Sequence, residues 1–262
     1  MSRLHLFEFE DQPWFPQVIR EGLMDYLRHM ISWVGFYRPA ATLIKRTLEQ
    51  SGERQIIELC AGGGGGVLKM KKYLDDLNCP AKIFLSDLYP NIKTYEKLKE
   101  KTHGEIDFIS RPVDALNVSE EIKGMRVMFT AFHHFKTEPA KKILKDAAEK
   151  KVPIAIFDAG KNLAGILLVP LLEPITFFFL TPFFKPFRWS RLLFTYLIPL
   201  IPLCTMWDGC VSILRLYSLR EMKQLAAEVS SRDYEWAVGR VKNSLKIPVN
   251  YIIGIPINTE TS

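Results

Sequence analysis

Several features that mark specialised classes of protein are missing from this 262-residue sequence. The four cysteines, at positions 60, 79, 204 and 210, form no C-x-x-C pair and have no clustered histidine partners, so we expect no metal site of the zinc type. No run of five or six like charges is present, and the net charge of +6 is only a mild excess. We therefore expect no nucleic-acid partner.

The beginning of the chain also lacks the pattern of a secretory signal peptide. Residues 1–11 contain Glu8, Glu10 and Asp11 and have no basic region followed by an apolar core, so they do not resemble a secretory signal peptide. A reducing, cytoplasmic location is the expectation that follows. Internal repeats and low-complexity linkers are absent as well.

What is present is enough apolar material for one large α/β domain, since 48% of the residues are hydrophobic. Residues 1–50 show helical spacing of apolar side chains, with Pro39 in the first turn of a second helix and Gly52 as its C-terminal cap. Seven short apolar stretches are typical of strands: Gln55–Cys60, Ile83–Leu85, Ile106–Ser110, Arg126–Thr130, Pro153–Phe157, Tyr234–Lys242 and Val249–Ile257.

Amphipathic helices are predicted between these strands, at Val67–Leu77, Asn91–Lys101, Glu138–Lys151 and Ser218–Val229. The last of these opens with a capping-box pattern, Ser218 to Glu221. This alternation predicts a doubly wound, seven-stranded, mostly parallel sheet with right-handed crossovers. The short loop between the last two strands predicts that they pair antiparallel.

The strongest chemical signal is the run from Glu58 through Gly62 to Gly66. A strand that leads through glycines into a helix lets the backbone approach a ligand closely, and the helix N-terminus adds oriented N–H groups. A dinucleotide site needs G-x-G-x-x-G, but the third glycine is missing in every register. A purely structural turn is the other alternative.

A different register places Glu58 at the head of an acidic-x-G-x-G-x-G pattern, with Gly62 and Gly64 in glycine positions and Cys60 in the place of the first glycine. In this register the chain resembles the class I S-adenosylmethionine-dependent methyltransferases. The resemblance implies a Rossmann-like fold and S-adenosylmethionine as cofactor.

Later motifs follow in the family's order. In that family, an acidic residue at the position of Asp87 binds the ribose hydroxyls, and one at the position of Asp114 meets the adenine amino group. The segment Phe129–Phe135 resembles the fourth motif, which often ends in a histidine pair. The resemblance implies these cofactor-binding residues: Glu58, Cys60, Ala61, Gly62, Gly64, Asp87, Leu88, Asp114, Ala115 and Ala131.

Each of these residues also has a structural alternative. Glu58 could pair with a nearby helix, Asp87 could cap the helix that follows it, and His133 and His134 could be structural. Methyl transfer needs a base only when the acceptor must lose a proton. His133 or His134 is the candidate for that catalytic role, because imidazole titrates near neutral pH.

The stretch 163–207 is the most unusual part of the sequence. Leu163 to Phe184 carries one charge, Glu173, and Leu192 to Cys204 carries none. Glu173 and the prolines at 170, 174 and 182 count against a regular membrane span. The alternatives are an apolar lid, a hairpin that enters one leaflet with Arg188, Trp189 and Arg191 at headgroup level, or an extra core layer or dimer interface.

Three candidate substrate-binding residues lie at or just after the end of the insertion. Trp207, Asp208 and Arg215 are candidates for binding a polar group of the substrate, and the alternative is that Asp208 and Arg215 pair with each other.

We therefore expect an N-terminal helical cap over 1–52 and a methyltransferase domain over 53–262 with the insertion 163–207. The predicted function is methyl transfer to a hydrophobic small molecule or lipid-like acceptor, in the cytoplasm or peripherally on the inner face of a membrane. The alternatives are a non-catalytic, membrane-associated binding or assembly protein on the same fold, and a nicotinamide-dependent oxidoreductase.

Overall fold

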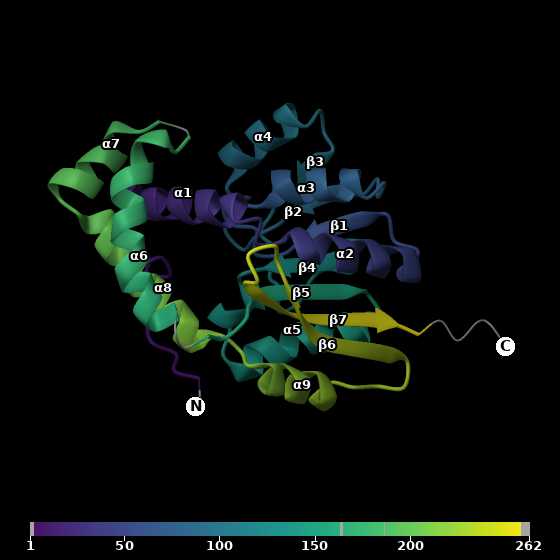
Figure 1. Cartoon of the computed structure of the whole chain (residues 1–262). Coiled ribbons are helices and arrows are strands. Elements are labelled where there is room, and N and C mark those ends of the chain that lie inside the picture. Colours follow the sequence, from purple (N-terminus) through teal and green to yellow (C-terminus); the bar gives the residue numbers. More distant parts are fainter. Residues whose placement is uncertain (1–2, 163–164, 186, 258–262) are drawn as a thin grey trace. The chain divides into compact units, whose positions relative to one another are not determined.

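The computed structural model of the chain (Figure 1) describes residues 3–162, 165–185 and 187–257. The chain divides into two compact units. Residues 35–160 and 217–262 form one, which we call the sheet unit. Residues 1–34 and 161–216 form the other, which we call the helical unit. The start of the predicted insertion, at 163–164, lies outside the described residues.

The sheet unit is built on a seven-stranded sheet, as predicted, with the order β3-β2-β1-β4-β5-β7-β6. The strands are β1 (Gln55–Glu58), β2 (Lys82–Leu85), β3 (Ile106–Phe108), β4 (Met125–Phe129), β5 (Ile154–Ala159), β6 (Tyr234–Lys242) and β7 (Pro248–Pro256). The first five strands pair parallel, and β7 pairs antiparallel with both β5 and β6.

The strand order explains which helices cover each face of the sheet. The chain moves outward from β1 to β3 and then, after returning to β4, in the opposite direction to β5, so right-handed crossovers place their helices on opposite faces. Figure 1 shows α2 (Arg38–Ser51) and α3 (Val67–Asp76) on one face, with α5 (Thr137–Glu149) and α9 (Leu219–Glu228) on the other. Helix α4 (Ile92–Lys101) packs against β3.

The helix boundaries in this unit follow local signals. Pro39 lies in the first turn of α2, and Gly52 closes that helix with a left-handed φ of 72°. Ser218 and Glu221 form the predicted capping box of α9.

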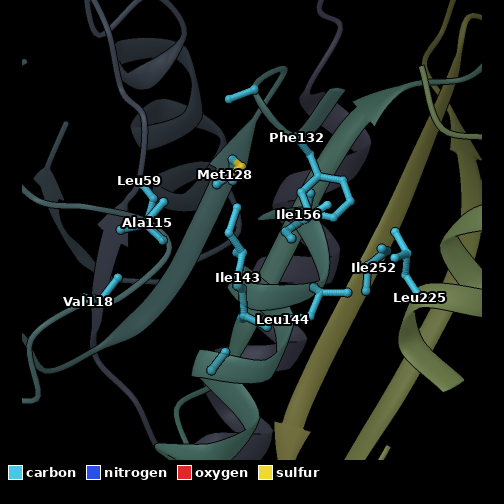
Figure 2. Packing of buried hydrophobic residues seen from close by; sticks show 14 of the residues in the cluster. Leu59, Ala115, Val118, Met128, Phe132, Ile143, Leu144, Ile156, Leu225 and Ile252 are labelled. Atoms are coloured by element: carbon cyan, nitrogen blue, oxygen red, sulfur yellow. The ribbon is translucent and has the colours of Figure 1, made fainter. Parts of the chain in front are cut away.

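A continuous apolar core fills the space between the sheet and the helices α5 and α9 (Figure 2). Met128 and Ile156 from the sheet meet Ile143 and Leu144 of α5, and Leu225 of α9 packs near Ile252. This core anchors the strands, so that their carboxyl ends hold loops in fixed positions.

The helical unit contains α1 (Gln17–Trp33), α6 (Gly165–Leu180), α7 (Trp189–Leu192) and α8 (Leu200–Arg215), with a 3-10 turn at Thr181–Phe183 and a π-helical turn at Leu193–Leu197. Its apolar core includes Phe177 of α6 stacked on Tyr26 of α1, with ring centroids 3.9 Å apart. Arg191 is buried and donates to the carboxylate of Asp25 at 2.6 Å.

The helices depart from the sequence patterns at two places. Helical structure over 1–50 begins only at Gln17, because Pro13 and Pro16 remove backbone donors and restrict the residues before them. Helix α6 in turn continues through Pro170 and Pro174. Gly209 of α8 allows close packing there, since an added Cβ would lie 3.1 Å from both Val169 and Glu173.

The same packing explains how α6 accommodates Glu173. Burial raises the pKa of this carboxyl group to about 8, so it is largely neutral at pH 7.

By length and composition alone, one helix among the described residues, Gly165–Phe183, could cross a membrane. The pair Trp189–Leu197 and Leu200–Arg215 would pass as a second only if the 79° bend between them were ignored.

The units differ from the predicted division of the chain. Helix α2, which the prediction assigned to the N-terminal cap, belongs to the sheet unit because it packs against α3 and β7. The helical segment after β5 extends beyond 207, since α8 ends only at Arg215.

Candidate functional site

The candidate site lies at the carboxyl ends of β1 and β4, the neighbouring strands from which the crossovers diverge in opposite directions. In open α/β sheets such a point leaves a crevice where ligands bind. The loop after β1 carries the glycine run, and the loop after β4 carries the histidine pair.

The glycine loop follows β1 directly and leads into α3. Gly62 and Gly64 have φ values of 51° and 65°, which side chains rarely adopt. A Cβ on Gly64 would lie 2.7 Å from Leu98 and 3.3 Å from Leu85, so this position also lacks room. Cys60, which replaces the first glycine of the pattern, has a φ of 54° and therefore carries backbone strain next to the site.

Asp87 connects this loop to the end of β2. Its Oδ2 accepts a hydrogen bond from the backbone N–H of Gly62 at 2.8 Å, and its Oδ1 accepts from that of Tyr89 at 2.9 Å. The suggestion that Asp87 caps the next helix was wrong, because Asn91 caps α4 by accepting from the N–H of Thr94. Each carboxylate oxygen keeps a lone pair for a further donor.

The end of β3 contributes to the same place. Asp114 is exposed, and its Oδ1 accepts from the N–H of Leu116 at 2.9 Å. Burial raises the pKa of the Cys60 thiol to about 12, and the nearby negative charges of Asp87 and Asp114 add to the shift. The loops after three adjacent strands therefore come close together near Cys60. Their role in binding a nucleoside stays a prediction.

Glu58, the last residue of β1, is a buried acid. Burial raises the pKa of its carboxyl group to about 8. Its backbone carbonyl accepts from both the N–H and the hydroxyl of Ser86, which fixes the strand end beside β2.

Small side chains complete the predicted cofactor set. Ala61, Ala115 and Ala131 are buried, the last two within the core cluster, whereas Leu88 is exposed. Their role in binding a cofactor stays a prediction.

The histidine pair lies in a 3-10 turn, Phe132–His134, after β4. The Asp158 carboxylate of β5 accepts from the backbone N–H of His133 at 3.0 Å and contacts its Nδ1 at 2.9 Å. This pairing favours a proton on Nδ1 and therefore a lone pair on Nε2. The His134 ring lies beside that of His133, with centroids 4.3 Å apart.

Two tyrosines belong to this region that the sequence did not indicate. Tyr95 of α4 is fully buried, and its hydroxyl donates to the carbonyl of Gly62 at 2.8 Å. Tyr37, at the start of α2, packs on Phe129 at the end of β4 with ring centroids 4.6 Å apart. The sequence around a tyrosine at helical spacing does not show whether its side chain reaches a functional site or packs in the core.

The three predicted substrate-binding residues all lie in α8 and contact the N-terminal segment of the helical unit. The indole N–H of Trp207 donates to the carbonyl of Phe7 at 3.1 Å. Asp208 accepts from the N–H groups of Phe9 and Glu10 at 2.7 and 3.1 Å.

Arg215 donates to Glu8 at 2.6 Å and to Asp11 at 2.7 Å. Asp208 therefore pairs with backbone donors and Arg215 pairs with two other acids, instead of with each other.

Comparisons with known proteins give a likeness of fold. No protein-family model matches the sequence. No curated protein matches it either. Among solved structures, the plantazolicin methyltransferase BpumL, in complex with S-adenosylhomocysteine and a pentazolic desmethyl analogue, is 13% identical with a TM-score of 0.59, and the match covers 95% of this chain and 97% of BpumL.

Two further solved structures show the same likeness of fold. A protein of Nostoc punctiforme PCC 73102 assigned as an O-methyltransferase is 13% identical with a TM-score of 0.52, and the match covers 97% of this chain and 64% of that protein. An O-methyltransferase of neocarzinostatin biosynthesis, in complex with S-adenosylhomocysteine and a dihydroxynaphthoic acid, is 14% identical with a TM-score of 0.53, over 90% of this chain and 58% of that protein. The chain therefore has the Rossmann-like fold of the class I methyltransferases, as its motifs predicted.

Proposed function

We propose that this protein transfers a methyl group from S-adenosylmethionine to a hydrophobic small molecule. The observation that carries the proposal is the link from Asp87 at the end of β2 to Gly62 of the glycine loop, at the point where the strand order reverses. The structures of similar fold, which are complexes of methyltransferases with S-adenosylhomocysteine, support it.

The residues present fit this cofactor. Asp87 keeps acceptor capacity for two ribose hydroxyls while the glycine loop holds it in place. Asp114 offers an exposed carboxylate on the neighbouring loop for the adenine amino group. Glu58 ends β1 just before the glycine run, and we assign its carboxyl group to the ammonium group of the amino-acid end.

The cofactor supplies an activated methyl group on a positively charged sulfur, so the protein's task is mainly positioning and exclusion of water. A hydroxyl acceptor would also have to lose its proton. We assign that step to His133, whose Nδ1 is held by Asp158 so that Nε2 can take the proton. His134, whose ring lies beside it at an interplanar angle of 32°, is the alternative base.

The helical unit indicates the class of acceptor, and its larger segment, residues 161–216, follows β5 in the chain. Large apolar side chains recur along α6 and are well exposed, as at Leu167 (78%), Leu171 (62%) and Phe178 (61%). At spacings of four and seven residues, these three side chains share one face of the helix. We infer that this face contacts an apolar acceptor or a lipid surface, which would place the protein peripherally on a membrane.

Incubation with S-adenosylmethionine labelled in its methyl group tests the proposal. Purified protein would be offered a panel of apolar aromatic and long-chain compounds that carry hydroxyl or amino groups. The proposal expects labelled product together with an equal amount of S-adenosylhomocysteine for at least one acceptor class. Cofactor that is neither bound nor consumed would contradict it.

A second candidate function is a non-catalytic, membrane-associated binding or assembly protein on the same fold. The exposed apolar face of α6 favours it. Binding of S-adenosylhomocysteine together with vesicle binding, but no label transfer to any extracted lipid or small molecule, would support this candidate instead.

A further inference from the structure

Tyr37 is a buried tyrosine at the carboxyl end of the sheet that none of the steps above uses. Only 6% of its surface is exposed. Its ring packs between Phe36 and Phe129, with centroid distances of 4.9 and 4.6 Å. The ring also lies close to Gly66, the glycine before α3, since a Cβ built on Gly66 would be in van der Waals contact with it at 3.6 Å.

The hydroxyl of Tyr37 is buried without a well-formed hydrogen bond to any residue that the structure describes, although it lies against the side chain of Thr130. Leaving a buried hydroxyl unsatisfied costs about 1–3 kcal/mol. Such a group in a folded protein needs an explanation. One explanation is a ligand that supplies the missing hydrogen-bond or charge partner.

The backbone of Thr130 is a second, independent indication of a ligand site at the same place. It follows β4 and has a φ of 44°, a conformation that is a clear outlier for a β-branched residue. Strain of this kind costs about 1–3 kcal/mol and is concentrated at functional sites. The strained residue and the unsatisfied hydroxyl thus lie side by side.

The charged groups around the hydroxyl indicate what kind of partner would bind. Burial raises the pKa of Tyr37 well above its ordinary value, and the charges of Asp158 and Glu58 raise it further. Both of these groups are acidic. Two acids, Glu58 at the end of β1 and Asp158 of β5, therefore lie near enough to act on this hydroxyl, and its polar neighbour Thr130 offers a further oxygen, which favours a cation over a neutral or anionic group.

We propose that the Tyr37 hydroxyl, together with Thr130, recognises the positive charge of the sulfonium cofactor and so distinguishes S-adenosylmethionine from its neutral product. This inference rests on the proposed function. Methyl transfer removes the positive charge, because the electron pair of the broken C–S bond stays on sulfur. The attraction of the tyrosine oxygen is lost in the same step, and the product is released more easily.

Calorimetric titration of the whole protein with S-adenosylmethionine and, separately, with S-adenosylhomocysteine tests this role. Tyr37→Phe removes only the hydroxyl. We expect it to weaken binding of S-adenosylmethionine about five- to tenfold and to change binding of S-adenosylhomocysteine less than about twofold. Since the hydroxyl makes no well-formed hydrogen bond within the described part of the chain, the variant should unfold at a denaturant concentration no lower than that of the unchanged protein.

Tyr234→Phe is the matched control. Tyr234 is a buried tyrosine of the same unit, and its hydroxyl donates to the carbonyl of Val152 before β5, at the opposite end of the sheet. This control should lose stability but keep the ratio of the two affinities.

An equal loss for both ligands, or no loss for either, in Tyr37→Phe would overturn the role of Tyr37 while leaving the proposed function intact. Failure of the unchanged protein to bind either ligand would overturn both.

Discussion

At the scale of single residues, the site is held together by contacts between loops that follow different strands. Asp87 accepts from the N–H of Gly62, and Tyr95 donates to the carbonyl of the same glycine, so the two peptide groups on either side of Gly62 are fixed from the loop after β2 and from α4. A loop fixed in this way is ready to receive a ligand without first being ordered, which lowers the entropic cost of binding.

Glu58 makes this part of the protein sensitive to pH. The folded pKa, about 8, lies above the unfolded value of 4.5, so the folded state holds a proton that the unfolded state loses. Stability is therefore fully present below pH 4.5 and falls as the pH rises toward 8. We expect Glu58→Gln to raise the free energy of unfolding by about 2–4 kcal/mol at pH 8 and by less than about 0.5 kcal/mol at pH 4.

Urea unfolding at the two pH values measures the effect, and Glu120→Gln, at an exposed position, is the control that should change little at either pH. Equal stabilisation by Glu58→Gln at pH 4 and pH 8 would show that the Glu58 carboxyl does not titrate as the structure implies.

The proposed base gives a prediction about turnover. Replacement of both His133 and His134 by Gln should lower the turnover number about 10²- to 10⁴-fold for a hydroxyl acceptor and leave the affinity for S-adenosylhomocysteine within about twofold. His103→Asn is the control, because His103 is exposed and its left-handed φ of 50° is one that Asn tolerates. Unchanged turnover in the double variant would dismiss the base.

Residues of the site differ in how well the sequence indicated them. Glu58, Asp87 and Asp114 follow strands, and the carboxyl ends of parallel strands meet at one edge, so their convergence could be predicted. Tyr37 and Tyr95 could not, since each reaches the site from a helix through packing that no local pattern encodes. The partners of Asp208 and Arg215 lie about 200 positions away in the N-terminal segment, beyond any spacing argument.

At the scale of elements, strands were predicted more accurately than the segment after β5. All seven strands end within two residues of their predicted limits, because short apolar runs bounded by polar residues have few other ways to fold. The sequence pattern did not predict helix α6, because its two prolines have a low intrinsic helix propensity. In the structure, packing against Gly209 of α8 outweighs the cost of placing these prolines in a helix.

The capping box of α9 provides a test at this scale. Ser218 accepts from the N–H of Glu221 and Glu221 accepts from that of Ser218, and Met222 and Leu225 of the helix are part of the buried core. Ser218→Ala should lower the free energy of unfolding by about 1 kcal/mol. Ser218→Asp, which keeps an acceptor, should recover most of the loss, and equal losses in both variants would show that capping does not stabilise this helix.

At the scale of the whole molecule, the two units present different chemistry. The sheet unit carries the acids and glycines suited to a cofactor, and the helical unit carries most of the exposed large apolar side chains. A net charge of +6 adds attraction to anionic surfaces. This combination is typical of a protein that meets its acceptor at or near a lipid surface.

Co-sedimentation with vesicles tests that interpretation. We expect binding to vesicles of phosphatidylcholine with phosphatidylserine, and a decrease of at least about tenfold in the partition coefficient when Leu171 and Phe178 are both replaced by Ser. Leu245→Ser is the control, because Leu245 is equally exposed, at 60%, but lies in the sheet unit. Loss of cofactor binding is not expected in any of these variants, and unchanged vesicle binding would argue for a lid or an interface instead.

The glycine loop and Asp87 are proposed to bind the adenosine part of S-adenosylmethionine. Calorimetric titration with S-adenosylhomocysteine, of the unchanged protein beside Asp87→Ala, tests it most directly. Asp76→Ala, at an exposed acid in the last turn of α3, is the control. We expect micromolar binding by the unchanged protein and the control, and a loss of about ten- to a hundredfold in Asp87→Ala. Absence of binding by the unchanged protein, or equal binding by Asp87→Ala, would contradict it.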